Sequence, residues 1–280
     1  MKVLGSLVAL YDNPAAIPLL HRDVTLPIDE IQPLSIIAAS LDLFIQRIID
    51  RLHHSRMMQH HEGHTTAQKF FTSENAASYD SVARYATFGQ DSAWKRKIVE
   101  AVCDRGSILE LACGTGILSK MLVQSGRSVV GLDLTFDYLL ASRNKIDVRV
   151  SQGTAEALPY KEAQFDAIVS SYLAKYVDVE FVVKECLRVL RPGGIVVFHD
   201  FTYPEGWGMR KLWKFYFSIL RLCGFFAPSW KTVFNHLDSY IENSRWVLKT
   251  EQALHQYRFS NVSVQYLTAG TAAIIIAEKP

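Results

Sequence analysis

The chain has 280 residues, of which 49% are hydrophobic, and a formal net charge of +2. This length accommodates one large α/β domain with an extension, and the apolar fraction supports a substantial core. The small net charge argues against nucleic acid as a partner, and no apolar run reaches the ~20 residues of a membrane-spanning helix.

The cysteines and the first residues of the chain indicate in which cellular compartment the protein is expected. The four cysteines are scattered without a Cys-x-x-Cys pair, which predicts buried free thiols in a reducing environment. The first apolar run ends at Asp12 without a clear cleavage site, so we expect no signal peptide. These observations favour a cytoplasmic protein.

Residues 1–66 differ in pattern from the rest of the chain. Prolines interrupt the beginning, and apolar residues from Leu34 to Met58 then recur every three or four positions. This spacing predicts one amphipathic helix within a partly helical N-terminal extension. Three uses of the extension stay open: a cap over the active site, packing on the sheet, or formation of a homodimer.

Histidines gather near the end of this extension, at His53, His54, His60, His61 and His64. Imidazoles are good zinc ligands, so a metal site is one interpretation. The other interpretation, which we favour, is a solvated polar stretch that joins the predicted helix to the main domain. We therefore predict no metal.

Aromatic and small residues mix from Phe70 onward, and a helix is expected from about Ser92 to Cys103. The next stretch, S-I-L-E-L-A-C-G-T-G-I-L-S at 107–119, carries most chemical information. An apolar run typical of a buried strand leads into the turn Gly114-Thr115-Gly116 and a helix from Ile117. Glycines let a backbone approach a ligand closely, and amides at a helix start face it. The stretch therefore predicts a site for a nucleotide-like ligand.

A second strand is predicted over Ser128–Asp133. A carboxylate at its end can accept both hydrogen bonds of a ribose diol, and its separation from Gly116 suits a βαβ unit. The alternative role for Asp133 is a helix N-cap, although Thr135 is also suited to that role. We favour the ribose role.

The remaining pattern predicts an α/β fold with a doubly wound, mostly parallel sheet and ligands at the carboxyl ends of the strands. A helix is expected over Val179–Leu190, and the turn Pro192-Gly193-Gly194 should end it and reverse the chain. Two extended runs that flank Thr268–Gly270 predict a C-terminal antiparallel hairpin. The other strands are expected at Asp147–Ser151, Phe165–Ser171 and Ile195–Phe201.

Several segments occur in the order found in one enzyme family. They read Y-D-S-V-A-R-Y, W-K-R, L-E-L-A-C-G-T-G, G-L-D, A-E-A-L-P, F-D-A-I-V-S-S and R-V-L-R-P-G-G, followed by F-Y-F-S-I-L, S-Y-I-E-N-S-R and Y-L-T-A-G-T-A. With them the chain from about Phe71 resembles the menaquinone and ubiquinone C-methyltransferases, which are class I S-adenosylmethionine-dependent methyltransferases. The resemblance implies a Rossmann-like domain with a seven-stranded sheet over residues 67–280.

The resemblance also implies S-adenosyl-L-methionine as cofactor. Thr115 would face its methionine moiety, Asp133 its ribose and Thr154 its adenine, although many relatives carry Asn or Asp at that last position. A lid ahead of the first strand would bring Tyr79 and Tyr85 near the ligands, unless they only pack in the core. The expected cofactor-binding residues are Glu110, Ala112, Gly114, Thr115, Gly116, Asp133, Leu134, Thr154, Ala155 and Ser171.

The family typically carries an Arg-Asn pair after the fourth strand, where a bound water has been proposed as general base. This chain has Lys175 and Tyr176 there. Lysine keeps the charge but lacks the planar fork of arginine. We name Lys175 and Tyr176 as catalytic candidates and add His199 and Asp200 near the same edge. Each of these residues could equally be structural.

Residues 206–237 contain no Asp or Glu and interleave basic with aromatic residues. Such a stretch suits peripheral contact with an anionic membrane, or it forms a lid helix whose aromatics line an apolar pocket. Both interpretations imply a hydrophobic small-molecule substrate, and neither favours nucleic acid.

The family resemblance predicts ring C-methylation of a polyprenylated quinol. A ring carbon is a poor nucleophile unless a neighbouring phenol loses its proton, so a base or a cation is required. Two alternatives stay open. One is N- or O-methylation of another lipid or small molecule, and the other is a non-catalytic, cofactor-binding partner in a quinone-synthesis complex. The glycine turn and Asp133 argue against loss of cofactor binding.

Overall fold

The computed structural model describes residues 63–143, 145 and 147–280. The helix expected within residues 34–58 and the histidines before His64 lie outside this range. The boundary at residue 66 between extension and domain stays a prediction. No helix among the described residues is long and apolar enough to cross a bilayer.

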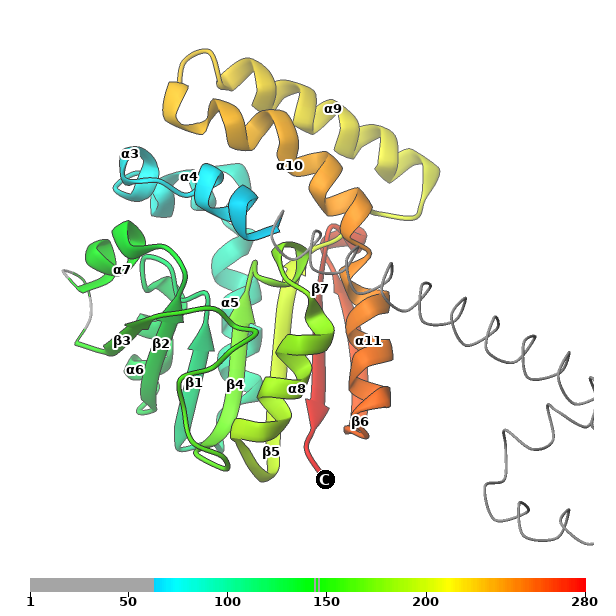
Figure 1. Ribbon diagram of the computed structural model, residues 1–280. Coiled ribbons are helices and arrows are strands. Elements are labelled where there is room, and N and C mark those ends of the chain that lie inside the picture. Colours follow the sequence, from blue (N-terminus) through cyan, green and yellow to red (C-terminus); the bar gives the residue numbers. More distant parts are fainter. Residues whose placement is uncertain (1–62, 144, 146) are drawn as a thin grey trace, which may run out of the picture. The chain divides into compact units, whose positions relative to one another are not determined.

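A seven-stranded sheet forms the centre of the described chain, with the order β3-β2-β1-β4-β5-β7-β6. The first five strands are parallel, and β7 pairs antiparallel with both β5 and β6. The expected doubly wound sheet with a terminal hairpin is confirmed (Figure 1). The strands are β1 Ser107–Leu111, β2 Ser128–Asp133, β3 Arg149–Gln152, β4 Phe165–Ser171, β5 Leu190–Phe201, β6 Ser260–Leu267 and β7 Ala272–Glu278.

Helices cover both faces of the sheet. Alternate residues of a strand point to opposite faces, so Ile108 and Leu109 of β1 enter two different cores. One core contains side chains from α5 and α6, and the other contains side chains from α8 and α11. The helices on these faces are α5 Gln90–Ala101, α6 Ile117–Gln124, α8 Val179–Val189 and α11 Trp246–Gln256.

A helical cap lies beyond the carboxyl ends of the parallel strands (Figure 1). Helices α9 and α10 pack against each other, and a third apolar cluster joins Phe70 and Tyr176 to Trp230 and Phe234. The lid interpretation of residues 206–237 is therefore the arrangement found. The elements near this edge are α3 Ser73–Ala76, α4 Tyr79–Ala86, α7 Phe136–Arg143, α9 Trp207–Cys223, α10 Lys231–Ser244 and the 3₁₀ turns η2 Ala174–Tyr176 and η3 Pro228–Trp230.

Two sequence expectations need correction. The segment Pro192-Gly193-Gly194 lies inside β5, where the pairing with β4 shifts register, and it is not a turn that ends the preceding helix. Helix α8 already ends at Val189. The amide of Leu190 donates the last helical hydrogen bond, to the Cys186 carbonyl, and the backbone of Leu190 itself is extended. Gly193 has φ of +71°, which accommodates the bulge. All four cysteines are free, but Cys103 and Cys223 are exposed and not buried.

Candidate functional site

The loop after β1 wraps tightly before α6 begins. Ala112, Gly114 and Gly116 have φ values of +55°, +55° and +83°, a region that favours glycine. The Gly114 amide donates a hydrogen bond of 2.8 Å to Asp133 Oδ2. The glycine turn of β1 is thereby attached to the carboxylate at the end of β2.

Asp133 is held by backbone amides on both of its oxygens. Besides the Gly114 bond, Oδ1 accepts the Thr135 amide at 2.8 Å. Burial raises the pKa of Asp133, and these amide bonds oppose that rise. A carboxylate has about four lone-pair sites, so acceptor capacity remains for a ligand diol. The Thr135 amide belongs to the residue directly before α7 and not to the first helical turn, so the bond is not the N-cap contact of the alternative interpretation. Asp133 also lines a cavity.

The first cavity, called cavity A here, opens at the carboxyl ends of β1, β2 and β4. Segments from the loop after β3 and from the cap complete its walls. Of the predicted cofactor-binding residues, those lining it are Ala112, Gly114, Asp133, Leu134, Thr154, Ala155 and Ser171. The structure thus brings these seven residues to one cavity, whereas Glu110, Thr115 and Gly116 lie behind its wall.

Glu110 and Thr115 make contacts of their own behind cavity A. Ser119, which replaces the third glycine of the dinucleotide pattern, donates its hydroxyl to the buried Glu110 carboxyl. Thr115 Oγ1 donates to Asp80 Oδ1 at 2.6 Å, and Lys145 Nζ lies 2.6 Å from the other Asp80 oxygen. Asp80 lies in the first turn of α4, so it ties the cap to the glycine loop. Sequence reasoning missed Asp80 because this contact joins distant segments.

Glu110 gives the protein a distinctive stability profile. Burial raises its pKa to about 8, from an ordinary value of 4.5. Between these pH values the folded state keeps a proton that the unfolded chain releases, so the free energy of unfolding falls as pH rises. We expect Glu110→Gln to keep the Ser119 contact, to lack this decline and to be the more stable protein at pH 8. Thermal unfolding from pH 5 to 9 checks it, and parallel melting profiles would contradict it.

Cavity A has cap residues that the sequence did not assign. His64 Nε2 lies 2.9 Å from Glu156 Oε1, and both side chains line the cavity. That hydrogen bond raises the pKa of His64. Tyr79 lines the cavity as the lid interpretation expected, whereas Tyr85 is 74% exposed and lines no cavity described here. The unassigned lining residues also include Ala67, Phe71, Tyr138 and Tyr172.

A second, apolar cavity, cavity B, lies between α4, η2, α9 and α10. Its walls are mostly aromatic and aliphatic, and Lys175 is the one charged side chain lining it within the described residues. Four aromatic residues line both cavities and form their common wall: Phe71, Tyr79, Tyr172 and Tyr176. Cavity B is further lined by Trp213, Tyr216, Phe217, Leu220, Trp230, Val233, Phe234 and Leu237.

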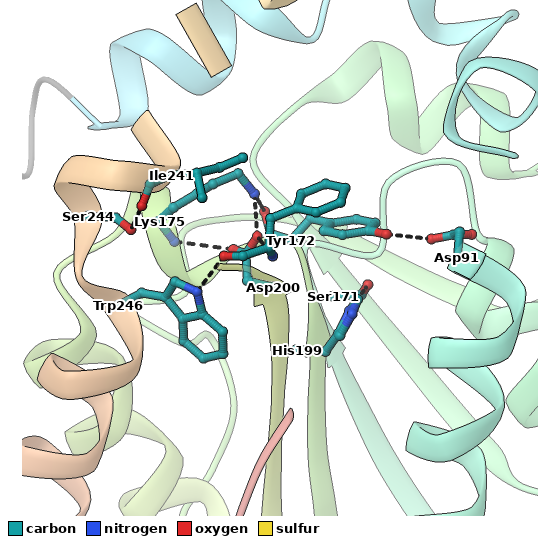
Figure 2. A network of polar contacts seen from close by, with 10 residues as sticks. Asp91, Ser171, Tyr172, Lys175, His199, Asp200, Ile241, Ser244 and Trp246 are labelled. Carbon is teal, nitrogen blue, oxygen red and sulfur yellow. Dashed lines mark hydrogen bonds and ion pairs between the residues drawn. The ribbon is translucent and has the colours of Figure 1, made fainter. Parts of the chain in front are cut away.

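Lys175 forms a buried ion pair at the edge of cavity B. Its Nζ lies 2.6 Å from Asp200 Oδ1 and 3.1 Å from the Tyr172 carbonyl (Figure 2). Burial lowers the pKa of Lys175, and the charge of Asp200 opposes that change. The ammonium also lies 4.5 Å from the centre of the Tyr176 ring, whose buried hydroxyl has no hydrogen-bond partner among the described residues. A positive charge is therefore fixed beside an apolar cavity.

His199 lines neither cavity. Its Nδ1 lies 2.9 Å from Ser171 Oγ, and its buried Nε2 has no hydrogen-bond partner within the described part of the chain. Burial and the nearby Lys95 and Lys175 charges lower its pKa well below the ordinary value, so the imidazole is neutral. Asp200 also does not line cavity B, and its carboxylate holds the Lys175 ammonium in place through the ion pair.

Comparisons with known proteins agree with this geometry. A model of the ubiE/COQ5 methyltransferase family matches residues 57–279. The demethylmenaquinone methyltransferase of Thermus thermophilus is 31% identical over 221 residues, which are 74% of this chain and 99% of that protein. The demethylmenaquinone methyltransferase of Streptomyces avermitilis is 31% identical, over 71% of this chain and 88% of that protein.

Solved structures share the fold. A Thermotoga maritima S-adenosylmethionine-dependent methyltransferase, described as a possible histamine N-methyltransferase, has a TM-score of 0.51 and 18% identity over 73% of this chain and 95% of that one. Geranyl diphosphate C-methyltransferase from Streptomyces coelicolor, in complex with Mg²⁺, geranyl diphosphate and S-adenosyl-L-homocysteine, has a TM-score of 0.50 and 16% identity over 68% and 79%.

Proposed function

The chain belongs to the ubiE/COQ5 methyltransferase family, and we propose that it methylates a ring carbon of a polyprenylated quinol such as demethylmenaquinol. It is an S-adenosyl-L-methionine-dependent methyltransferase. The observation that carries the proposal is the apolar cavity B, which only an aromatic wall separates from cavity A. An apolar cavity suits a hydrophobic methyl acceptor, and the single cation that lines it suits negative charge developing on that acceptor.

We place the cofactor in cavity A. When bound, S-adenosyl-L-methionine supplies a methyl group activated by its sulfonium. The chain provides Asp133, with acceptor capacity left for the ribose diol, and the loop around Thr154 and Ala155 for the adenine. Glu110 and Thr115 support this cavity from behind through Ser119 and Asp80. The residues present therefore fit the cofactor.

Lys175 supplies the electrostatic part of the proposed mechanism. A quinol ring carbon becomes nucleophilic when its neighbouring phenol ionises, and the Lys175 ammonium beside cavity B would stabilise that phenolate. Asp200 fixes the position of the ammonium. The wall of Phe71, Tyr79, Tyr172 and Tyr176 would exclude water and align the acceptor with the methyl group. Tyr176 lies in this wall as a positioning residue.

The test is turnover of labelled S-adenosyl-L-methionine with a panel of acceptors under reducing conditions. We expect methyl transfer to demethylmenaquinol and to its short-prenyl analogues, and none to phosphatidylethanolamine or catechol. Transfer to either of the latter would identify a lipid or small-molecule N- or O-methyltransferase. Cofactor binding without turnover on any acceptor would support the non-catalytic alternative.

We further propose that the outer face of α9 contacts an anionic membrane. The inner side of α9 lines cavity B, yet a second apolar stripe faces outward, with Phe215 63% and Phe226 92% exposed. This stripe contains Leu212, Phe215, Ile219 and Leu222 of α9, and Phe226 lies just beyond the end of the helix. Lys211 Nζ lies 4.0 Å from the centre of the Trp207 ring, and Lys231 Nζ lies 5.4 Å from the centre of the Phe225 ring. Cations therefore lie next to the apolar stripe. Apolar side chains with adjacent lysines match the acidic headgroup region.

Vesicle sedimentation tests this contact. We expect binding to vesicles that contain phosphatidylserine, and roughly tenfold or more loss of binding in Lys211→Glu/Lys214→Glu, at about 1 kcal/mol per charge. Phe217→Leu, a change at a buried residue of the same helix, is the control and should bind normally. Equal binding to neutral and acidic vesicles would contradict the charge argument. A dimer that Phe215→Ser dissociates would instead show that the stripe joins two copies of the chain.

A further inference from the structure

Tyr172 lies directly after β4 in an unusual backbone conformation. Its φ is +70°, a region that bulky residues rarely adopt because it strains the backbone. Its side chain remains partly accessible, whereas Ser171, Leu173 and Lys175 are buried. It lines both cavity A and cavity B. The surrounding structure therefore holds this phenol where cofactor and acceptor would meet.

The Tyr172 hydroxyl hydrogen-bonds to a buried ion pair. It donates to Asp91 Oδ1 at 2.8 Å (Figure 2), and Asp91 is paired with Lys95 one turn along α5. Asp91 and Lys95 are 3% and 4% exposed. The Tyr172 ring stacks on Phe201 at 4.7 Å with an interplanar angle of 17°. These contacts fix the phenol oxygen, and its hydrogen points to the Asp91 carboxylate.

The other groups of cavity B cannot take the acceptor's proton so readily. Lys175 is an ammonium paired with Asp200 and has no lone pair to offer. Tyr216 donates to the Ala86 carbonyl, and no described residue accepts a hydrogen bond from the Tyr176 hydroxyl. Among the described residues, Tyr172 is the neutral side chain that both lines cavity B and hydrogen-bonds to a carboxylate.

We propose that Tyr172 takes the phenolic proton of the acceptor while it passes its own proton to Asp91. This inference rests on the proposed quinol substrate. The acceptor O–H and Tyr172 O–H bonds break, and new O–H bonds form on Tyr172 and Asp91. A π electron pair of the ring carbon then forms the new carbon–carbon bond to the methyl group, and the phenolate oxygen becomes a carbonyl oxygen. The bond between that methyl group and sulfur breaks, and its electron pair stays on sulfur. The ring proton leaves to water, its bonding electrons restore the aromatic ring, and Asp91 returns its proton through Tyr172. One proton is released per methyl transferred.

The charges around Tyr172 suit this relay. Lys95 Nζ lies 4.7 Å and Lys175 Nζ 5.3 Å from the ring centre, so two cations offset negative charge during transfer. Burial and Asp91 raise the pKa of Tyr172, which keeps it a phenol rather than a phenolate. The titratable and charged groups that face it are Asp91, Lys95, Lys175, His199, Asp200 and Tyr79.

The experiment compares Tyr172→Phe with Tyr160→Phe, which changes a partly buried tyrosine that packs against Phe165 and lines neither cavity. We expect kcat with demethylmenaquinol to fall roughly 100-fold or more in Tyr172→Phe, the usual range for proton-transfer groups, and little in Tyr160→Phe. The deficit should shrink with a fluorinated quinol of lower phenol pKa and at high pH, where the acceptor ionises unaided. The dissociation constant for S-adenosyl-L-methionine should stay within about threefold.

Asp91→Asn provides the second variant. Its kcat should also fall, and the fall should be smaller with more acidic acceptors, because an amide cannot receive the relayed proton. Wild-type kcat in Tyr172→Phe, or a loss independent of acceptor acidity and pH, would overturn the relay while leaving the proposed function intact. A wild-type protein that methylates no quinol would overturn both.

Discussion

Asp133→Ala is expected to weaken S-adenosyl-L-methionine binding by roughly 30-fold, or about 2 kcal/mol, the usual worth of a hydrogen bond to a charged group. The proposed acceptor for the ribose would be removed, and the amides of Gly114 and Thr135 would lose the carboxylate that accepts their hydrogen bonds. The glycine loop would then be less ordered before the cofactor binds. Calorimetric titration of the cofactor into each protein measures the change.

Two matched variants separate charge from loop support. Asp133→Asn keeps one acceptor oxygen for a backbone amide and should fall between wild type and Asp133→Ala. Asp137→Ala removes a carboxylate from the first turn of α7 that does not line cavity A, and it should bind like wild type. Unchanged affinity in Asp133→Ala would show that the ribose lies elsewhere.

Lys175→Met is expected to lower the free energy of unfolding by about 3–5 kcal/mol, because it leaves the Asp200 carboxylate buried without its partner. It should also reduce turnover, since no other cation lines cavity B among the described residues. Denaturant unfolding and the methyl-transfer assay measure the two effects independently.

A double variant distinguishes the structural from the chemical contribution of Lys175. Lys175→Met/Asp200→Asn removes both charges. In the wild-type protein the Phe201 amide donates to Asp200 Oδ1 at 2.7 Å, and the side-chain oxygen of the Asn can still accept that hydrogen bond. We expect most of the lost stability to return, while turnover stays low. Wild-type turnover in this double variant would show that the ammonium has no part in the reaction. Lys175→Arg keeps the charge and should retain more activity than Lys175→Met.

Local patterns predicted the sheet, and they placed the glycine turn and Asp133 at one edge of it. The glycine turn and Asp133 each follow a strand, and the carboxyl ends of parallel strands meet at one edge, so sequence order alone brings them together. The terminal hairpin was predictable for a similar reason, because its two extended runs flank a short turn. Such features depend on residues that are close in sequence.

Contacts between distant segments were not predictable in this way. Asp80 bonds to Thr115 only because α4 folds over the glycine loop, and Tyr172 meets Asp91 only after α5 packs beside the sheet. The positive φ of Tyr172 has no signature in its residue type. The amphipathic pattern of α9 also left its orientation open, because this helix has apolar residues on both its inner and outer sides.

The position of the transferred methyl group tests the central claim most directly. The protein, S-adenosyl-L-methionine labelled with ¹³C in its methyl group, and demethylmenaquinol are incubated under reducing conditions, and the product is examined by NMR. The account predicts a labelled methyl carbon attached to a carbon atom of the quinone ring. A labelled methyl on oxygen, or cofactor binding with no labelled quinone, would contradict it.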